Sequence, residues 1–411
     1  MEISPDVHWV GVNDAKSKFF ESLWSIPKGV SLNSYLVLGK DKKALIDTVK
    51  EDFFNEYIEN LRSLIDPEDI DYIILNHVEP DHAGSLSKIL SIASKASVIS
   101  SKNGIDFVKH YHQVPFNDIS VKDGDKVDLG GKTLKFIMTP CIHWPETMST
   151  FLGEDGVLFS GDLFGAFDSI GEKIFDDHIN EASIYAAKRY FTSILSPYYC
   201  SINSALKKLD KLQKPCRVIA PTHGLIYRDD PAFITKLYAD LCSGKFEEKV
   251  VIVYGSMYGN TKVLAEAVSK GVNDKGVKVA LFNVTYSDPS EILTELWQAP
   301  AIAVGSPVYD CYIFPPVTNL LELIKVKRMK KRVFGLFGDY TWGGGPLQQL
   351  QNKIKDLGSE VVGSFVKAQG SPTPNNVESA RELGNLLADI AIKKTKEASA
   401  LAPVQDPFCP I

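Results

Sequence analysis

The sequence predicts an α/β protein made of two units, and three observations carry that prediction. Short strand-like runs alternate with helical periodicity from the start of the chain to about residue 245. Beyond that point the alternation becomes regular, with wholly apolar strand runs followed by amphipathic helices, as in a doubly wound parallel sheet. A short polar segment, 242–249, separates the two patterns. A chain of 411 residues is also long enough for two or three domains.

In the first unit, apolar and polar residues that alternate between turn residues predict the strands. Apolar residues that recur three to four positions apart predict the helices. The expected strands are 30–38, 43–47, 72–75, 97–100, 133–138, 156–160 and 217–220. The expected helices are 53–63, 85–93, 180–195 and 202–213.

The second unit shows a repeated order of strand and helix. The expected strands are 249–254, 277–283, 301–305, 332–337 and 360–366, and the expected helices include 262–275, 289–297, 347–357 and 377–395. Asp288 is placed to cap the helix that starts at residue 289. We therefore expect domains at 1–247 and 248–395, followed by a proline-containing, loosely held tail at 396–411.

Composition excludes several classes of protein. A net charge of −6 gives no basic footprint for nucleic acid. No apolar run approaches the roughly 20 residues that span a bilayer, and the N-terminus lacks the pattern of a secretory signal. The six cysteines form no C-x-x-C pair and are expected to be buried thiols. These features predict a cytoplasmic protein.

The segment directly after the strand 72–75 is rich in metal-ligand side chains. It contains His77, Glu79, Asp81 and His82, and the i, i+2 spacing is expected to send the first three to one side of an extended segment. Further candidates follow other strand ends, at His143, Asp162 and His223. Four histidines and three carboxylates are what two adjacent metal ions need. Such ligands fit zinc, manganese or iron, and a flavin-binding neighbour would favour iron.

The segment 256–261 lies between an apolar strand and a helix, where backbone N–H groups can receive a phosphate. No lysine follows the glycine as a P-loop requires, and G-x-G-x-x-G is absent, so flavin mononucleotide (FMN) is the expected ligand. The hydroxyls at both ends add donors, and the glycine permits the turn. The expected contacts are Ser256, Met257, Tyr258, Gly259, Asn260 and Thr261.

Two more segments fall at the carboxyl ends of predicted strands, where open α/β sheets bind ligands. We expect them to bracket the isoalloxazine ring, with Tyr309, Tyr340 and Trp342 as the aromatic candidates. The expected contacts are Ser306, Pro307, Val308, Tyr309 and Asp310 in the first, and Gly338, Asp339, Tyr340, Thr341, Trp342, Gly343 and Gly344 in the second.

The pattern H-x-E-x-D-H followed by His, Asp and His resembles the metallo-β-lactamase superfamily, whose hydrolases usually have histidine where this chain has Glu79. Glutamate there resembles the flavodiiron proteins, as do the segments 143–148, 159–165 and 220–224. The resemblance covers both units in order, to about residue 395. The family commonly has Thr-x-Asn-Asn and Ser-Tyr-Gly-Trp in its two ring loops; here 308–311 and 339–342 depart from that pattern.

The resemblance implies a metallo-β-lactamase-like αββα sandwich followed by a flavodoxin-like sheet. It implies two irons bridged by an oxo or hydroxo group. His77, Glu79 and His143 would hold one iron and Asp81, His82 and His223 the other, with Asp162 bridging them. Lys50, just after the strand 43–47, could reach the cleft and influence the choice between the two gases, but we interpret it as a solvated surface lysine.

Such a protein would reduce dioxygen to water or nitric oxide to nitrous oxide, and the sequence does not distinguish the two gases. An external donor, rubredoxin or a similar small carrier with its reductase, would supply FMN with electrons. A head-to-tail homodimer, or a dimer of dimers, is also implied. The alternative is a metal-dependent hydrolase with an accessory flavin domain, against which Glu79 and the phosphate loop argue.

Overall fold

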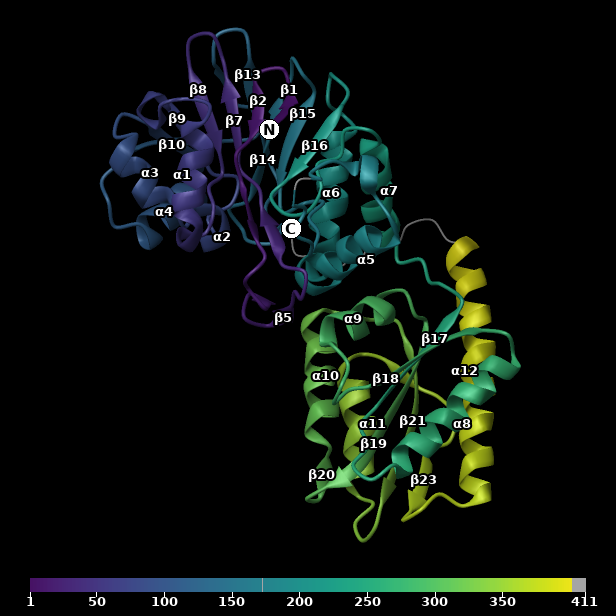
Figure 1. Ribbon diagram of the computed structural model, residues 1–411. Coiled ribbons are helices and arrows are strands. Elements are labelled where there is room, and N and C mark those ends of the chain that lie inside the picture. Colours follow the sequence, from purple (N-terminus) through teal and green to yellow (C-terminus); the bar gives the residue numbers. More distant parts are fainter. Residues whose placement is uncertain (172, 401–411) are drawn as a thin grey trace. The chain divides into compact units, whose positions relative to one another are not determined.

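The chain divides into two compact units, one of Met1–Cys242 and one that begins at Ser243 (Figure 1). The computed structural model describes residues 1–171 and 173–400. The boundary predicted from the sequence, between residues 247 and 248, falls a few residues after this division and within the polar segment 242–249. Among the described residues, no helix combines the length and apolar character that crossing a bilayer requires.

The first unit is built on two sheets, which Figure 1 shows between two groups of helices. One sheet has the strand order β1-β2-β7-β8-β9-β10-β11 and the other β12-β13-β14-β15-β16. Their facing apolar side chains form one core, in which the rings of Tyr35 and Phe159 lie 5.2 Å apart. The predicted αββα sandwich is confirmed.

The elements of the first unit have the following bounds. The strands of the larger sheet are β1 (Glu2–Ser4), β2 (Val7–Trp9), β7 (Tyr35–Leu38), β8 (Lys43–Ile46), β9 (Tyr72–Ile74), β10 (Ser97–Ser101) and β11 (Asn117–Val121); those of the smaller are β12 (Lys126–Asp128), β13 (Thr133–Met138), β14 (Met148–Leu152), β15 (Val157–Gly161) and β16 (Val218–Pro221). Two short pairs join β3 (Val12–Asp14) to β6 (Val30–Leu32) and β4 (Phe19–Phe20) to β5 (Trp24–Ser25). The helices are α1 (Phe54–Arg62), α2 (Pro80–Ala83), α3 (Leu86–Ile92), α4 (Lys102–Tyr111), α5 (Glu181–Tyr190), α6 (Tyr199–Leu209) and α7 (Pro231–Cys242).

The second unit is a parallel sheet in the order β18-β17-β19-β21-β22, with β23 also pairing with β21. This is the 2-1-3-4-5 order of flavodoxin-like folds, so the predicted doubly wound sheet is confirmed. Its strands are β17 (Lys249–Tyr254), β18 (Lys278–Asn283), β19 (Ala301–Tyr309), β20 (Tyr312–Ile313), β21 (Val333–Tyr340), β22 (Glu360–Val361) and β23 (Val366–Gln369). Its helices are α8 (Asn260–Asp274), α9 (Pro289–Trp297), α10 (Pro315–Val326), α11 (Pro346–Asp356) and α12 (Pro374–Ala400). Asp288 caps α9 as predicted, accepting the Ser290 N–H at 2.7 Å.

Several predicted elements need correction. The strand 30–38 is two strands, because Asn33 leaves the pairing and donates through Nδ2 to the Pro221 and Gly224 carbonyls. The strand 360–366 is also two, interrupted at Gly363, whose φ is +68°. Helices α2, α4, α7 and α10 were not predicted. Helix α12 extends to Ala400, into the predicted tail; residues 401–411 of that tail lie outside the described residues.

The cysteines only partly match the expectation of buried thiols. Cys242 is a buried free thiol, whereas the free thiols of Cys141 and Cys216 are partly exposed and that of Cys311 is exposed. Cys200 is disulfide-bonded. Cys409 lies outside the described residues.

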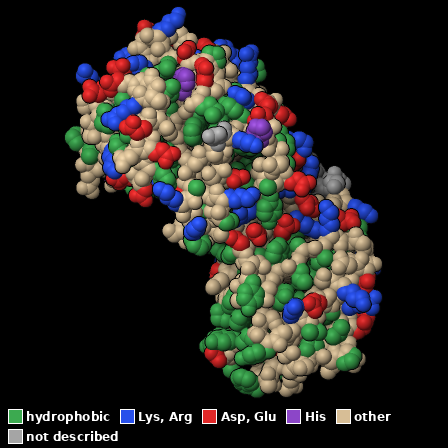
Figure 2. All heavy atoms as spheres, viewed as in Figure 1, with side chains coloured by type: hydrophobic (Ala, Val, Ile, Leu, Met, Phe, Trp, Pro, Cys, Tyr) green, Lys and Arg blue, Asp and Glu red, His purple; other side chains and the backbone are tan. Residues whose placement is uncertain are grey.

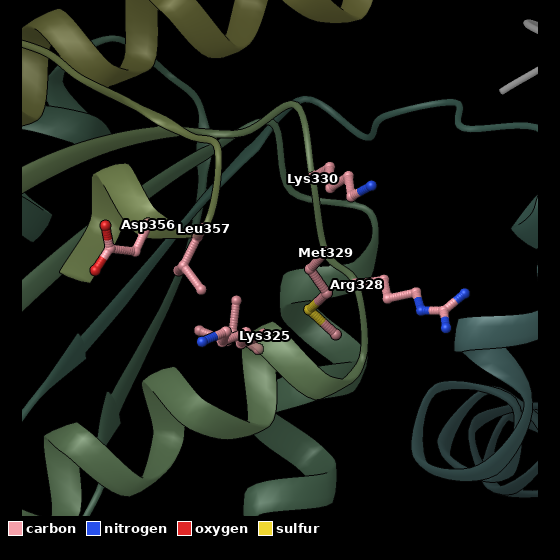
Figure 3. Close-up of a pocket in the computed structure, with 7 residues that line it drawn as sticks. Lys325, Arg328, Met329, Lys330, Asp356 and Leu357 are labelled. Carbon is pink, nitrogen blue, oxygen red and sulfur yellow. The ribbon is translucent and has the colours of Figure 1, made fainter. Parts of the chain in front are cut away.

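A cavity of about 120 Å³ lies between the ends of α10 and α11 (Figure 3). It is lined by Ile324, Lys325, Arg328, Met329, Lys330, Asp356 and Leu357. In Figure 3 the side chains of Arg328 and Lys330 extend away from Leu357, so their positive charges do not converge on the cavity. The lining residues precede β21 and β22. The cavity therefore lies at the amino edge of the parallel sheet, opposite the edge that carries the predicted flavin loops.

Candidate metal centre and flavin site

The first metal-ligand segment combines a strand end with a short helix. His77 and Glu79 lie in the segment that connects β9 to α2, and Pro80 then starts α2, which carries Asp81 and His82. Proline is favoured at this first helical position. The expectation that Asp81 continues the extended segment is therefore wrong. The helical turn separates it from Glu79 and directs it, with His82, toward a second group of ligands.

One group consists of His77, Glu79, His143 and Asp162, whose ligand atoms lie within 4.8 Å of one another. Glu79 Oε2 is 3.1 Å from His77 Nε2 and 3.0 Å from His143 Nε2. Asp162 Oδ2 is 3.6 Å from the first nitrogen and 3.5 Å from the second. Two imidazole nitrogens and two carboxylate oxygens thus converge on one point, as ligands of a metal ion do.

The other group consists of Asp81, His82 and His223, also within 4.8 Å of one another. Asp81 Oδ2 is 3.2 Å from His223 Nε2, and Asp81 Oδ1 is 3.6 Å from His82 Nε2. Asp162 faces this group through its other oxygen: Oδ1 is 3.2 Å from His82 Nε2 and 3.5 Å from His223 Nε2. One carboxylate therefore presents a different oxygen to each group.

The donor atoms of the second group fit a bound cation. Both carboxylate oxygens of Asp81, His82 Nε2 and His223 Nε2 are buried and have no hydrogen-bond partner among the described residues. Burying such groups without partners costs free energy, and a metal ion would be their partner. The set contains nitrogen and carboxylate oxygen but no thiolate, so it suits two zinc, manganese or iron ions.

Charge at the centre favours the same interpretation. Burial raises the pKa of Asp162, but the positive charge of the nearby His82 outweighs burial and holds that pKa well below its usual range. Burial also raises the pKa of Asp81, but the charge of His82 again outweighs burial, so this pKa is lowered as well. Both carboxylates are therefore anionic at neutral pH and able to bind cations.

Two ligands are oriented by their second ring nitrogens. His77 Nδ1 is 2.6 Å from Glu146 Oε1, and His223 Nδ1 is 2.8 Å from the Ser31 carbonyl. Such bonds fix the tautomer and leave Nε2 facing the metal. Glu146 is buried and also accepts the Val78 N–H at 3.1 Å. We predicted no role for it; its place three residues after His143 was the available signal.

Tyr190 was missed as well. Its hydroxyl donates to Asp162 Oδ1 at 2.7 Å. The residue ends α5, and the predicted helix 180–195 continues as a π-helical turn, Phe191–Leu195. Such turns occur often at functional sites. Phe20, from the unpredicted β4–β5 hairpin, packs its ring edge-on to His223 at 5.3 Å. Both contacts join segments distant in sequence.

Lys50 is not the solvated surface lysine that we predicted. Its ammonium lies 3.3 Å from a carboxylate oxygen of Asp14, whose side chain is fully buried, and its own side chain is only 28% exposed. It also lies 5.9 Å from the centre of the Phe20 ring. The lysine therefore belongs to the packed shell beside the metal centre.

The predicted phosphate loop has the expected position in the second unit. It connects the end of β17 to the start of α8, and Gly259 takes the left-handed conformation there, with φ +99°. Ser256 Oγ accepts the Gly259 N–H at 3.1 Å. Thr261 is buried and donates its hydroxyl to Asp339 Oδ1, whereas the Tyr258 side chain is exposed. The start of a long helix, a left-handed glycine and clustered hydroxyls fit a phosphate group.

The two predicted ring segments are more strand-like than expected. Residues 306–309 belong to β19 and residues 338–340 to β21, and Ser306 pairs with Gly338 in register. Only the turn at 310–311 and the segment from Thr341 onward are loops. The Ser306 hydroxyl is committed within β19, since it donates to the Pro307 carbonyl at 2.8 Å.

The aromatic candidates differ in exposure. The side chains of Tyr309 and Trp342 are exposed, whereas Tyr340 is partly buried. Figure 2 shows apolar side chains gathered over the part of the second unit that carries β20, whose Tyr312 is exposed as well. The carboxyl edge of the sheet therefore offers apolar surface for a planar ring.

Comparisons with known proteins agree with this geometry. The family described as "ODP family beta lactamase" matches residues 30–224, and "Flavodoxin" matches residues 252–384. The chain is 34% identical over 394 residues to the anaerobic nitric oxide reductase flavorubredoxin of Pectobacterium atrosepticum, covering 94% of this chain and 77% of that one. It is 35% identical to the protein of that name in Salmonella arizonae, over 94% and 81%.

Solved structures match across both units. The rubredoxin oxygen:oxidoreductase of Desulfovibrio gigas superposes with a TM-score of 0.92 at 30% identity, over 98% of this chain and 100% of that one. The flavodiiron protein of Giardia intestinalis gives the same TM-score at 26% identity, over 97% and 98%.

Proposed function

The chain belongs to the flavodiiron protein family, and we propose that it reduces dioxygen to water, nitric oxide to nitrous oxide, or both. It is an FMN- and diiron-dependent oxidoreductase. The observation that carries the proposal is Asp162, a single carboxylate that turns one oxygen toward each of two ligand groups. Glu79 stands where a hydrolase of the superfamily usually has histidine, so hydrolysis is not favoured.

We further propose the ligand roles that the distances support. His77, Glu79 and His143 would hold one iron, Asp81, His82 and His223 the other, and Asp162 would bridge them. Two ferrous ions and one fully reduced FMN would together provide four electrons, the number that reduction of dioxygen to water takes. Tyr190 Oη lies 2.7 Å from Asp162 Oδ1 and donates a hydrogen bond to this carboxylate. Phe20 and Phe167 pack beside that tyrosine and keep water from its side of the centre.

The flavin would lie at the carboxyl edge of the second unit, in a domain we delimit as 248–395 after a diiron domain at 1–247. The phosphate would be received by residues 256–261, and residues 306–310 and 338–344 would flank the ring. The left-handed Gly259 at the start of α8 and the exposed aromatic side chains around β20 support this assignment.

We propose that the electron donor is a separate small carrier, such as a rubredoxin, reduced by its own reductase. The sequence holds no C-x-x-C, the cysteine pair that such a carrier has. The name of the rubredoxin oxygen:oxidoreductase of Desulfovibrio gigas pairs such a carrier with oxygen. We also propose a head-to-tail homodimer, alone or paired into a dimer of dimers, and a cytoplasmic location, where the disulfide bond of Cys200 would be an exception.

The purified protein should be yellow and contain about one FMN and two irons per chain. The measurement is plasma-emission metal analysis together with the visible spectrum. Metal content limited to zinc, with no flavin absorbance, would overturn the proposed function and favour the hydrolase.

Electron supply gives a second expected result. Anaerobically prepared protein should consume dioxygen or nitric oxide slowly with NADH alone and rapidly once a reductase and a rubredoxin-type carrier are added. An electrode records either gas, so both substrates can be compared in one assay. Rapid turnover by the purified chain with NADH alone would contradict the need for a carrier.

A further inference from the structure

The carboxylate of Asp339 lies against the start of α8. Thr261 Oγ1 donates to Asp339 Oδ1, and the Asn260 side chain and the Thr261 N–H are close enough to lower the pKa of this carboxyl. Asn260 and Thr261 are the first two residues of α8, and Gly259 before them offers no side chain as a cap. A carboxylate from the end of β21 therefore supplies the anion that the amino end of a helix favours.

The same end of α8 is where the flavin phosphate is proposed to bind. A threonine hydroxyl carries one proton, so it can donate to one acceptor at a time. If Thr261 donates to a phosphate oxygen, its bond to an ionised Asp339 is lost. The phosphate and the carboxylate then compete for the one proton of the Thr261 hydroxyl. If Asp339 is protonated, its own O–H can donate to Thr261 Oγ1, and the threonine proton is free for the phosphate.

The surroundings of Asp339 favour its neutral form over its charged form. Burial raises the pKa of this carboxyl, and the hydrogen bonds from Thr261 and Asn260 offset burial only in part. In register with it, β19 presents Pro307 and β23 presents Ala368, neither of which is charged.

The two lysines nearest to these positions in sequence are engaged elsewhere. The Lys367 ammonium lies 5.0 Å from the centre of the Phe365 ring. That of Lys262 lies 3.7 Å from a carboxylate oxygen of Glu266. Neither lysine is among the groups that shift the pKa of Asp339, so no cation there holds the carboxylate in its charged form.

We propose that Asp339 is a specificity-determining residue of the flavin site, which admits the phosphate of FMN together with one proton from solvent. This inference rests on the proposed FMN site. The proton joins the Asp339 carboxylate, the resulting O–H donates to Thr261 Oγ1, and the Thr261 O–H turns to the phosphate. No other bond changes. Affinity for a flavin phosphomonoester should therefore fall as pH rises, whereas affinity for a flavin without phosphate should not.

The experiment compares FMN binding by the flavin-depleted full-length chain and its Asp339→Asn variant. Flavin fluorescence quenching gives Kd from pH 6.5 to 8.5, above the second pKa of a phosphomonoester at roughly 6. Because bound FMN raises the pKa of Asp339, affinity is greatest below the pKa of the free protein. Above that pH the affinity for FMN falls, by at most about tenfold per pH unit, until the pH reaches the pKa of Asp339 in the complex.

The wild type should weaken by about tenfold over this pH range, and Asp339→Asn should give a flat profile with tighter binding at pH 8.5. The asparagine amide donates to Thr261 as the protonated carboxyl does. Riboflavin, which lacks the phosphate, should bind both proteins with the same pH profile. In Thr261→Val the shared hydroxyl is absent, so the Asp339→Asn substitution should no longer change the slope.

Equal slopes for FMN in the wild type and Asp339→Asn, or weaker binding by the variant at pH 8.5, would overturn the role of Asp339 alone. Failure of the wild type to bind FMN at any pH would overturn the proposed function with it. Iron content and far-ultraviolet circular dichroism, measured on the same samples, should be unchanged in Asp339→Asn.

Discussion

Asp162→Ala is expected to lose both irons and, with them, at least about a hundredfold of gas-reducing activity. The substitution removes the one carboxylate that faces both groups, through Oδ2 toward His77 and His143 and through Oδ1 toward His82 and His223. Each group is left with one carboxylate, and neither keeps the shared ligand. Plasma-emission analysis should show well under one iron per chain, while the flavin absorbance remains.

A matched control separates this loss from a general effect of removing a buried aspartate. Asp176 is also buried, and its carboxylate accepts the N–H groups of residues 228, 229 and 230 at 2.9, 3.0 and 2.9 Å. Asp176→Asn should lower the melting temperature and keep both irons, whereas Asp162→Asn should lose iron. An Asp162→Ala protein with two irons and full activity would show that the bridge assignment is wrong.

Glu146 provides a graded comparison with Asp162. It touches the centre only through His77, at 2.6 Å, and the Val78 N–H. Loss of such an outer partner typically costs about 10- to 100-fold in metal affinity. That smaller effect should fall on the group containing His77, not on both groups.

The candidate ligands could be predicted from the sequence because each one follows a strand. Strand ends hold the backbone in place while the next residues reach the edge of a sheet, so His143, Asp162 and His223 are visible as single residues after apolar runs. What the pattern could not supply is the division into groups. That depends on Pro80, which starts a helix between Glu79 and Asp81.

The shell around the ligands was not predictable in the same way. Glu146, Tyr190 and Phe20 reach the centre from segments far apart in sequence, and each is an ordinary polar or aromatic residue in its local pattern. Their roles arise only when two sheets pack face to face. The break at Asn33 also depends on a distant contact, the side-chain bond to the Pro221 carbonyl. The break at Gly363 is local, because its left-handed φ interrupts a strand whose composition favours continuity.

The largest gain of function is expected from mixing two inactive variants. In the proposed head-to-tail dimer, the metal centre of one chain receives electrons from the flavin of the other. His77→Ala with Glu79→Ala removes ligands of one group and leaves the second unit intact. Gly259→Trp forces a side chain onto a residue whose φ is +99°, at the turn proposed to receive the phosphate, and leaves the metal ligands intact. Each variant alone should be inactive.

Mixed dimers, isolated through two different affinity tags after refolding or coexpression, contain one composite site with an intact metal centre and an intact flavin. An equal mixture should regain about a quarter of wild-type activity, because half of its dimers are mixed and each has one working site of two. A pair defective in the same unit, His77→Ala/Glu79→Ala with Asp162→Ala, should regain none. The recovered rate per mixed dimer should not change on dilution, since exchange of electrons between separate molecules would fall with concentration. Verified mixed dimers that stay inactive would place electron transfer within one chain, because only then does neither chain hold a complete path.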